Sequence, residues 1–293
     1  MPLTRRTLFA VCATALPRAL AQTPLTARQV IERIQSELAV KFSNDTVDTF
    51  KAGDPDTPVR GIATTVMATF DVLKRAAAAN CNLVITHEPT FYNHQDSLAD
   101  FANDEVANAK LAFIKEHSMV VWRFHDYWHR RRPDGVQTGM AEILGWTKYA
   151  SPENPRLYTL PPATLESVAN GIQSRLHTRT LRVVGDPKLQ VSRVALSPGY
   201  SDLRGAVRAL SRPEVDLLVV GEQREWEGVE YAQDAITAGK KKALIVIGHA
   251  LSEENGMNEC ARWLRTFLPN VPVQFVPAGE AFWTPVKLPR PQK

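Results

Sequence analysis

The sequence predicts an α/β fold with a largely parallel sheet. Short apolar runs with the length of buried strands alternate with longer segments whose apolar residues recur at helical spacing. This alternation is typical of strand–helix–strand units, which place successive strands parallel to one another. The 293 residues are enough for one large core or two smaller ones.

The first half of the chain begins with a helix and then alternates strands with helices. Thr26 and Gln29 form a capping-box pattern, and the apolar residues that follow recur at helical spacing up to Leu38. Residues 44–58 are rich in Asp, Thr and Pro and predict a loop. The remaining predicted elements are strands at 59–66, 82–86 and 119–124, and helices at 68–79, 101–117 and 139–144.

A boundary is predicted at residues 151–162, which carry four prolines among polar residues. This boundary divides the mature chain into a first α/β lobe, 22–150, and a second, 151–293. Residues 197–200, Ser-Pro-Gly-Tyr, predict a turn. The other predicted elements of the second lobe are helices at 165–176, 203–210, 228–238 and 252–267, and strands at 180–184, 191–196, 217–220, 243–247 and 273–276.

Residues 1–21 have the composition of a cleavable signal peptide. A basic start with Arg5 and Arg6 is followed by an apolar run at 8–16 and by a small-x-small cleavage pattern at 19–21. The apolar run is too short to span a bilayer, which takes about 20 residues. The paired arginines favour a twin-arginine signal, and an ordinary secretory signal is the alternative. Either signal predicts a periplasmic or secreted protein with no membrane span.

Charge and cysteine content narrow the class further. The formal net charge of +4 falls to +1 when the three arginines of the leader are removed. No basic stripe is interleaved with aromatic residues, so no nucleic-acid partner is predicted. Cys81 and Cys260 remain in the mature chain and could pair in an exported protein. We favour two buried thiols, because each cysteine stands alone beside or within a predicted buried element.

Four of the seven histidines lie at or just beyond the ends of predicted strands, close to carboxylates. Ligands of open α/β sheets bind outside the carboxyl ends of the strands. Three strand ends that each deliver a histidine and an acid therefore predict one shared site. The residues are His87 with Glu88, His125 with Asp126 and His129, and His249 with Glu253.

The residue types at these strand ends are those that bind divalent metals. Imidazole and carboxylate are ligands for Zn, Mn, Fe, Co and Ni. Carboxylates can also bridge two ions, and a pair about 3.5–4 Å apart can acidify water and clamp both oxygens of a displacement. His249 and Glu253 share a face if a helix begins there. The sequence therefore predicts a site for two divalent metal ions of open identity.

Several motifs resemble those of the Nif-three-like dinuclear metal centre family, also known as type 2 GTP cyclohydrolase I homologues. Residues 70–91 contain the segment His87-Glu-Pro, where the family has His-His-Pro. Residues 133–145 resemble the family's Gly-Val-Asn-Asp segment and its following helix, and residues 248–253 resemble Gly-His-x-x-Thr-Glu. The resemblance covers most of residues 26–285. It implies two similar α/β lobes with mixed, largely parallel sheets flanked by helices, a two-metal site between the lobes, and a homohexameric ring.

The resemblance implies that His87, His249 and Glu253 bind metal. Glu88 replaces the second histidine of the His-His-Pro motif, so a carboxylate is expected where the family has an imidazole. The family's Gly-Asp-x-x-x-His segment has no histidine here, and Glu222 stands in the place of its acid. Glu222 could carry protons, anchor a ligand from behind, or simply be an acid at the start of a helix.

The segment from His125 to His129 departs from the family in a second way. The family's His-Thr-x-x-Asp reads here as His-Asp-Tyr-Trp-His, so His129 stands where a metal-binding Asp is expected. Either His129 itself is the ligand, or Asp126 reaches the metal after a small shift in register. The sequence leaves both alternatives open.

Two functions are consistent with such a site. The first is a metal-dependent hydrolase of a small molecule, which would be GTP by resemblance only, with Glu222 or Glu253 handling protons. The second is a non-catalytic metal-handling or metal-chaperone protein with the same ligands. A deep pocket with anion-binding groups would favour hydrolysis, whereas metals open to solvent would favour metal handling.

Overall fold

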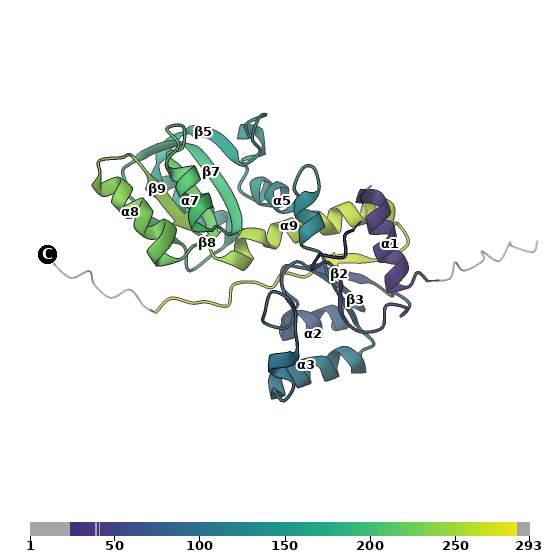
Figure 1. Ribbon diagram of the computed structural model, residues 1–293. Coiled ribbons are helices and arrows are strands. Elements are labelled where there is room, and N and C mark those ends of the chain that lie inside the picture. Colours follow the sequence, from purple (N-terminus) through teal and green to yellow (C-terminus); the bar gives the residue numbers. More distant parts are fainter. Residues whose placement is uncertain (1–23, 39, 41, 286–293) are drawn as a thin grey trace, which may run out of the picture.

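The computed structural model describes residues 24–38, 40 and 42–285, and the predicted signal peptide, residues 1–21, lies outside them. Two five-stranded sheets are flanked by helices (Figure 1). The predicted α/β class is therefore confirmed. Among the described residues, no helix is both long and apolar enough to cross a membrane.

The first sheet is parallel except at one edge. Its strand order is β1-β4-β3-β2-β10, with β10, β2, β3 and β4 parallel and β1 antiparallel to β4. The predicted second lobe spans residues 151–293, yet its last strand, β10, pairs with β2 of the first sheet. The strands are β1 (Phe50–Ala52), β2 (Ile62–Thr65), β3 (Leu83–Thr86), β4 (Val120–Arg123) and β10 (Val273–Phe275).

The second sheet is parallel in its centre and antiparallel at both edges. Its order is β5-β7-β8-β9-β6, with β7, β8 and β9 parallel and the outer strands β5 and β6 antiparallel. The carboxyl ends of the three parallel strands therefore meet at one edge of the sheet. The strands are β5 (Leu157–Thr164), β6 (Arg182–Val184), β7 (Gln190–Tyr200), β8 (Leu217–Glu222) and β9 (Ala243–Val246).

Most helices begin with a side chain that accepts a backbone N–H of the first turn. The predicted capping box is confirmed, since Thr26 N donates to Gln29 Oε1 at 3.0 Å and Gln29 N donates to Thr26 Oγ1 at 3.2 Å. The α-helices are α1 (Ala27–Leu38), α2 (Phe70–Ala78), α3 (Glu105–Glu116), α4 (Asp126–Arg130), α5 (Gly135–Ile143), α6 (Leu165–Leu176), α7 (Leu203–Leu210), α8 (Glu230–Thr237) and α9 (His249–Phe267).

Helix α9 joins the two sheets (Figure 1). Leu251, in its first turn, packs in the core of the second sheet, whereas Met257 and Leu264 pack in the core of the first. Helix α5 lies against α9 so closely that a Cβ on Gly139 would overlap the backbone of Asn255. The start of α9 is thereby fixed between the two sheets.

The predicted loop at 44–58 and the predicted boundary at 151–162 both contain strand residues. Strand β1 lies within residues 44–58, where three residues were too short a run to produce a strand pattern. Strand β5 crosses the proline-rich boundary, and its register with β7 shifts between Thr159 and Ala163, where two of the prolines stand. Proline is tolerated there because an edge strand leaves one side unpaired.

Two further boundaries differ from the sequence prediction. The predicted turn at residues 197–200 belongs to β7, whose register with β8 shifts there and whose Gly199 has a φ of +73°. Helix α9 begins at His249 rather than Ser252. Both cysteines of the described chain are free and buried, as predicted for Cys81 and Cys260.

Candidate metal centre

The histidines and acids singled out in the sequence come from both sheets. His87 and Glu88 follow β3, and His125 follows its parallel neighbour β4, so the same sheet edge carries all three. His129 lies in α4, four residues after His125. His249 and Glu253 occupy the first two turns of α9, and Glu222 ends β8. The structure brings all of these side chains into one region between the sheets.

Each of the four imidazoles is oriented by an acceptor at its Nδ1 atom. When the ring is neutral, such a partner selects the tautomer with the proton on Nδ1 and a lone pair on Nε2, which is the atom left to bind a metal. The four contacts are His87 Nδ1 to Phe124 O at 3.1 Å, His125 Nδ1 to Asp126 Oδ1 at 2.9 Å, His129 Nδ1 to Asp134 Oδ2 at 3.1 Å, and His249 Nδ1 to Glu222 Oε2 at 2.8 Å.

The four Nε2 atoms converge on two carboxylates, Glu88 and Glu253. The Nε2 atoms of His87, His129 and His249 lie 3.6, 3.9 and 3.3 Å from Glu253. Those of His125 and His249 lie 3.8 and 3.2 Å from Glu88 Oε1. Two overlapping groups have ligand atoms within 4.8 Å of one another: His87, His125 and His129, and His87, Glu88 and Glu253.

Two atoms at the centre of this cluster lack the partner that buried polar atoms normally have. Neither His87 Nε2 nor Glu253 Oε2 has a hydrogen-bond partner among the residues that the structure describes, although both are buried. Buried polar atoms in folded proteins are almost always hydrogen-bonded or bound to a metal. The donor set of four imidazoles and two carboxylates fits borderline divalent cations.

The charges of the cluster differ from histidine to histidine. Burial and the neighbouring imidazole of His87 lower the pKa of His125 to about 4, so His125 is neutral at pH 7. Burial also disfavours the charged form of His249, but its contacts with Glu253 and Glu88 outweigh burial and raise the pKa to about 11. Burial would raise the pKa of Glu253, yet the adjacent imidazoles hold it well below its usual value. Glu253 is therefore a carboxylate at neutral pH.

Asp126 points away from the centre of the cluster. One of its oxygens contacts His125 Nδ1, and the other accepts from Thr46 Oγ1 at 2.8 Å and from Val47 N at 3.3 Å. His129 instead directs its Nε2 toward Glu253. The sequence left open whether His129 or Asp126 faces the metal. The structure places His129 at the cluster and Asp126 behind His125.

Two further residues position the cluster and were not singled out from the sequence. Arg123 is fully buried, and its Nε donates to His87 O at 3.0 Å while Nη2 lies 3.4 Å from Glu88 Oε2. Asp48 accepts three backbone N–H groups of residues 125–127 and so caps α4. An arginine inside an apolar strand is a usable sequence signal for the first residue. Asp48 lies in a predicted loop and gives no comparable signal.

The second sheet supports α9 through close backbone approach. Ser252 Oγ accepts from Gly199 N at 2.8 Å and donates to His249 O at 2.7 Å. A Cβ on Gly199 would overlap Glu253 Oε1. The glycine of the β7 bulge therefore leaves the space that the Glu253 carboxylate occupies.

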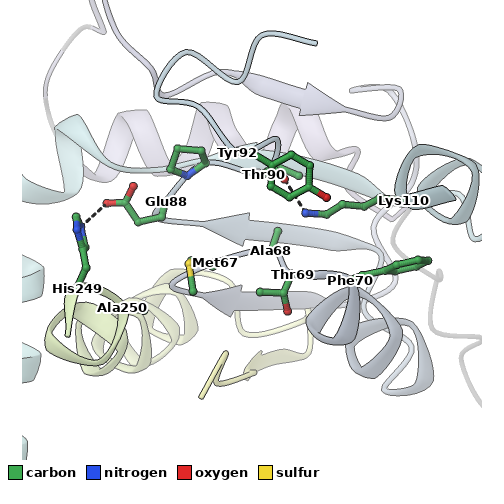
Figure 2. Close-up of a pocket in the computed structure, with 11 residues that line it drawn as sticks. Met67, Ala68, Thr69, Phe70, Glu88, Thr90, Tyr92, Lys110, His249 and Ala250 are labelled. Carbon is green, nitrogen blue, oxygen red and sulfur yellow. Dashed lines mark hydrogen bonds and ion pairs between the residues drawn. The ribbon is translucent and has the colours of Figure 1, made fainter. Parts of the chain in front are cut away.

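A cavity of about 400 Å³ opens beside the cluster and is lined in part by Glu88 and His249 (Figure 2). Its volume lies in the range of small-molecule sites in proteins. The Glu88–His249 pair forms one end of the cavity, so a molecule bound there would touch two members of the cluster.

Comparison with known proteins identifies the family. Residues 25–280 match the family described as Duf34/NIF3 (NGG1p interacting factor 3). The chain belongs to this family. The family resemblance inferred from the motifs is thereby confirmed, and the Duf34/NIF3 match covers both sheets.

Curated relatives of this Duf34/NIF3 chain share one descriptive name. A protein of Clostridium perfringens called "GTP cyclohydrolase 1 type 2 homolog" is 23% identical over 212 residues, which cover 69% of this chain and 76% of the relative. A protein of the same name from Clostridium acetobutylicum is 28% identical over 96 residues, or 33% of this chain. That second match spans only 34% of the relative's own length.

Solved structures share the fold at low sequence identity. The Staphylococcus aureus hypothetical protein SA1388 superposes with a TM-score of 0.69 and 18% identity, covering 86% of this chain and 96% of that one. A Bacillus cereus protein related to NIF3 gives a TM-score of 0.68 and 14% identity, covering 91% and 99%. These similarities establish the two-sheet architecture for the Duf34/NIF3 chain.

Proposed function

We propose that the cluster holds two divalent metal ions and that the protein is a metal-dependent hydrolase of a small molecule. The observation that carries the proposal is the convergence of four oriented imidazole Nε2 atoms on two carboxylates, with unpartnered atoms at its centre. The proposed ligands are His87, Glu88, His125, His129, His249 and Glu253. The candidate metals are Zn, Mn, Fe, Co and Ni.

The chemistry of the site would come from the metals and from the residues around them. Bound divalent cations would polarise a substrate oxygen and make water more acidic. Glu253 is buried and surrounded by imidazoles, which suits a ligand and bridging group better than a proton carrier. Glu222 keeps 54% of its side chain exposed beside His249, so it is the acid with access to solvent protons. Asp126 and Asp134 would orient His125 and His129.

The cavity favours hydrolysis over metal handling alone. It gives a substrate a place to bind in contact with Glu88 and His249. The opposite candidate, a metal-handling protein, is favoured by the 31% exposure of the His249 side chain and the 28% exposure of His129, which leave one side of the cluster open. The exchange rate of bound metal with a chelator separates the two, since a hydrolase keeps its metals through many turnovers.

The names of the curated relatives suggest where a substrate screen begins. Both are called GTP cyclohydrolase 1 type 2 homologues, so ring-opening hydrolysis of a purine nucleotide is one reaction to test. Fold and family alone do not set a substrate. A screen of nucleotides, cyclic amides and phosphoesters with metal-loaded protein covers the classes consistent with two metals and a small cavity.

The decisive experiment compares Glu253→Gln with the control Glu166→Gln, which changes an exposed acid of α6. We expect elemental analysis to find two divalent ions per wild-type or control chain. The Glu253→Gln variant should bind metal more than about 100-fold more weakly, because loss of a direct ligand exceeds the 10–100-fold effect of residues behind it. Equal metal content in both variants would overturn the proposal.

Export and assembly belong to the same proposal. The leader at residues 1–21 would direct a periplasmic or secreted protein, and the family resemblance implies a homohexamer. Fractionation of cells that express the full chain tests the first, with cleavage after Ala21 as the expected product. Light scattering of the purified mature chain tests the second. A protein that stays in the cytoplasm with residues 1–21 intact would contradict export.

A further inference from the structure

The cavity beside the cluster has two chemically different ends. Glu88 and His249 form one end, and Lys110 of α3 reaches into the other, as Figure 2 shows. The walls between them are mainly apolar and include Met67, Phe70 and Tyr92. A molecule that fills the cavity would therefore have an apolar body and a polar group at each end.

Lys110 is a buried cation with spare donors. The residue is only 3% exposed, and its Nζ donates to Thr90 O at 2.6 Å. The ammonium also lies 5.6 and 5.4 Å from the ring centres of Phe91 and Tyr92. No carboxylate among the described residues forms an ion pair with it. An ammonium has three N–H donors, so two remain after the bond to Thr90.

A second polar group at this end also lacks a partner. The Thr90 hydroxyl oxygen is buried, and no described residue forms a hydrogen bond with it. Thr90 and Lys110 both line the cavity. Buried charges are normally paired and buried hydroxyls normally hydrogen-bonded. Both exceptions at one end of one cavity indicate a ligand group that accepts hydrogen bonds and carries negative charge.

We propose that the cavity binds a small molecule with an apolar body and one anionic end group, a carboxylate or a phosphate. The anionic end pairs with Lys110 and the Thr90 hydroxyl, and the other end lies against Glu88 and His249. The position of the reacting end rests on the proposed function. The anion site does not, because Lys110 and Thr90 lie at the end of the cavity away from the Glu88–His249 pair (Figure 2).

The protonation of Lys110 is compatible with this role. Burial lowers the pKa of Lys110 to about 8, against the weaker opposing effect of Asp96. The amine is therefore still mostly protonated at pH 7. A purely structural lysine that supports the Thr90 carbonyl would use one donor and would show no preference between charged and neutral ligands.

The test is calorimetric titration of the full mature protein with 3-phenylpropionate and its neutral amide, 3-phenylpropanamide. We expect the carboxylate to bind at least about tenfold more tightly, the usual scale of a charge-assisted hydrogen bond. Lys110→Met should reduce the affinity for the carboxylate to that of the amide and leave the amide unchanged. Lys115→Met, an exposed change on the same helix, should keep the preference.

A further variant and a chelator control make the result interpretable even if Lys110→Met folds poorly. Thr90→Val keeps the backbone carbonyl that holds Lys110, so a weaker carboxylate preference in that variant supports the site even if Lys110→Met folds poorly. Titration after removal of metal by a chelator, with folding checked by circular dichroism, separates the lysine end from the metals. Benzyl phosphate in the same series shows which anion the site prefers.

The outcomes divide clearly. A preference that persists after chelation and is lost in Lys110→Met supports the proposal. The proposal is wrong if the wild-type protein does not prefer the carboxylate to the amide. It is also wrong if this preference remains in Lys110→Met, or if it disappears when the metal is removed by a chelator. Metal content and hydrolysis are measured separately, so failure of the proposed function would leave the anion-binding result intact.

Discussion

The two sheets have similar architectures but contribute differently to the cluster. The first sheet delivers His87, Glu88 and His125 directly from the ends of two parallel strands. The second sheet places only Glu222 at a strand end and otherwise acts through α9 and the glycine bulge of β7. The first sheet thus supplies ligands directly. The second sheet orients α9, which carries His249 and Glu253, and leaves space for the Glu253 carboxylate.

Two histidines of the cluster, His125 after β4 and His249 in α9, differ in charge. His125 has a pKa of about 4 and is a neutral ligand at pH 7. His249 has a pKa of about 11, because its contacts with the two carboxylates outweigh its burial, and it holds a proton without metal. His125 is therefore a ligand ready for metal, whereas His249 must lose a proton first.

Among changes outside the ligands themselves, the largest expected effect tests whether the second sheet provides space for Glu253. Gly199→Ala places a methyl group against Glu253 Oε1 and forces an unfavourable φ of +73° on alanine. We expect metal affinity to fall at least about 10–100-fold, as for residues that orient ligands. Elemental analysis after dialysis against competing chelator measures the loss.

The matched control for this change is Gly239→Ala. Gly239 has a similar φ of +77°, but nothing lies within 4 Å of the position a Cβ would take. The control should lower the midpoint of thermal unfolding by strain alone and leave metal content unchanged. If both variants lose metal equally, the space around Glu253 has no special role and the contrast between the sheets fails.

A second prediction tests the contrast in charge. Because the pKa of His249 is raised from 6.5 to about 11, the metal-free protein is protonated there at pH 8, and metal binding must release that proton. Apparent metal affinity should therefore rise with pH between pH 6.5 and about pH 11, by up to about tenfold per pH unit for each proton released. Titration calorimetry in buffers of different ionisation heat counts the protons.

Two variants assign those protons to residues. His249→Asn should release about one proton fewer than wild type at pH 8. His125→Asn should release the same number as wild type, because His125 is already neutral. The same linkage stabilises the metal-free fold below pH 6.5 and is lost as pH rises through about 11. Equal proton release from both variants would remove the distinction between the two histidines.

Much of this arrangement was predictable from the sequence because strand ends are visible in it. The apolar runs before His87 and His125 are neighbouring parallel strands, whose carboxyl ends meet at one edge of the first sheet. The run before His249 is β9 of the second sheet, so the third strand end comes from the other sheet and not from the same edge. The α/β class follows from the alternation of elements. The start of α9 was placed three residues too late because its N-cap, Gly248, provides no capping side chain.

Other features depend on contacts between distant residues and could not be predicted from local pattern. The choice between Asp126 and His129 is set by the short helix α4, whose first turn is capped by Asp48 from a loop 77 residues earlier than His125. Strand β1 is visible only through its pairing with β4. Lys110 carries no sequence signal, because a lysine within a helix is usually exposed.

The smallest expected effect concerns the acids behind the imidazoles and compares an exposed one with a buried one. Glu222→Gln removes the carboxylate at His249 Nδ1, where the acid is 54% exposed and water can replace it, so we expect about a tenfold loss of metal affinity. Asp134→Asn changes a side chain that is only 17% exposed. Its remaining oxygen still caps α5, so an amide NH2 replaces the acceptor at His129 Nδ1. The loss of metal affinity in Asp134→Asn should therefore be larger than in Glu222→Gln, toward the upper end of about 10–100-fold, with little change in thermal stability. Competition with a calibrated chelator measures both. A larger loss in Glu222→Gln would mean that the second sheet contributes more than space, and Glu222 would then have to be treated as part of the cluster itself.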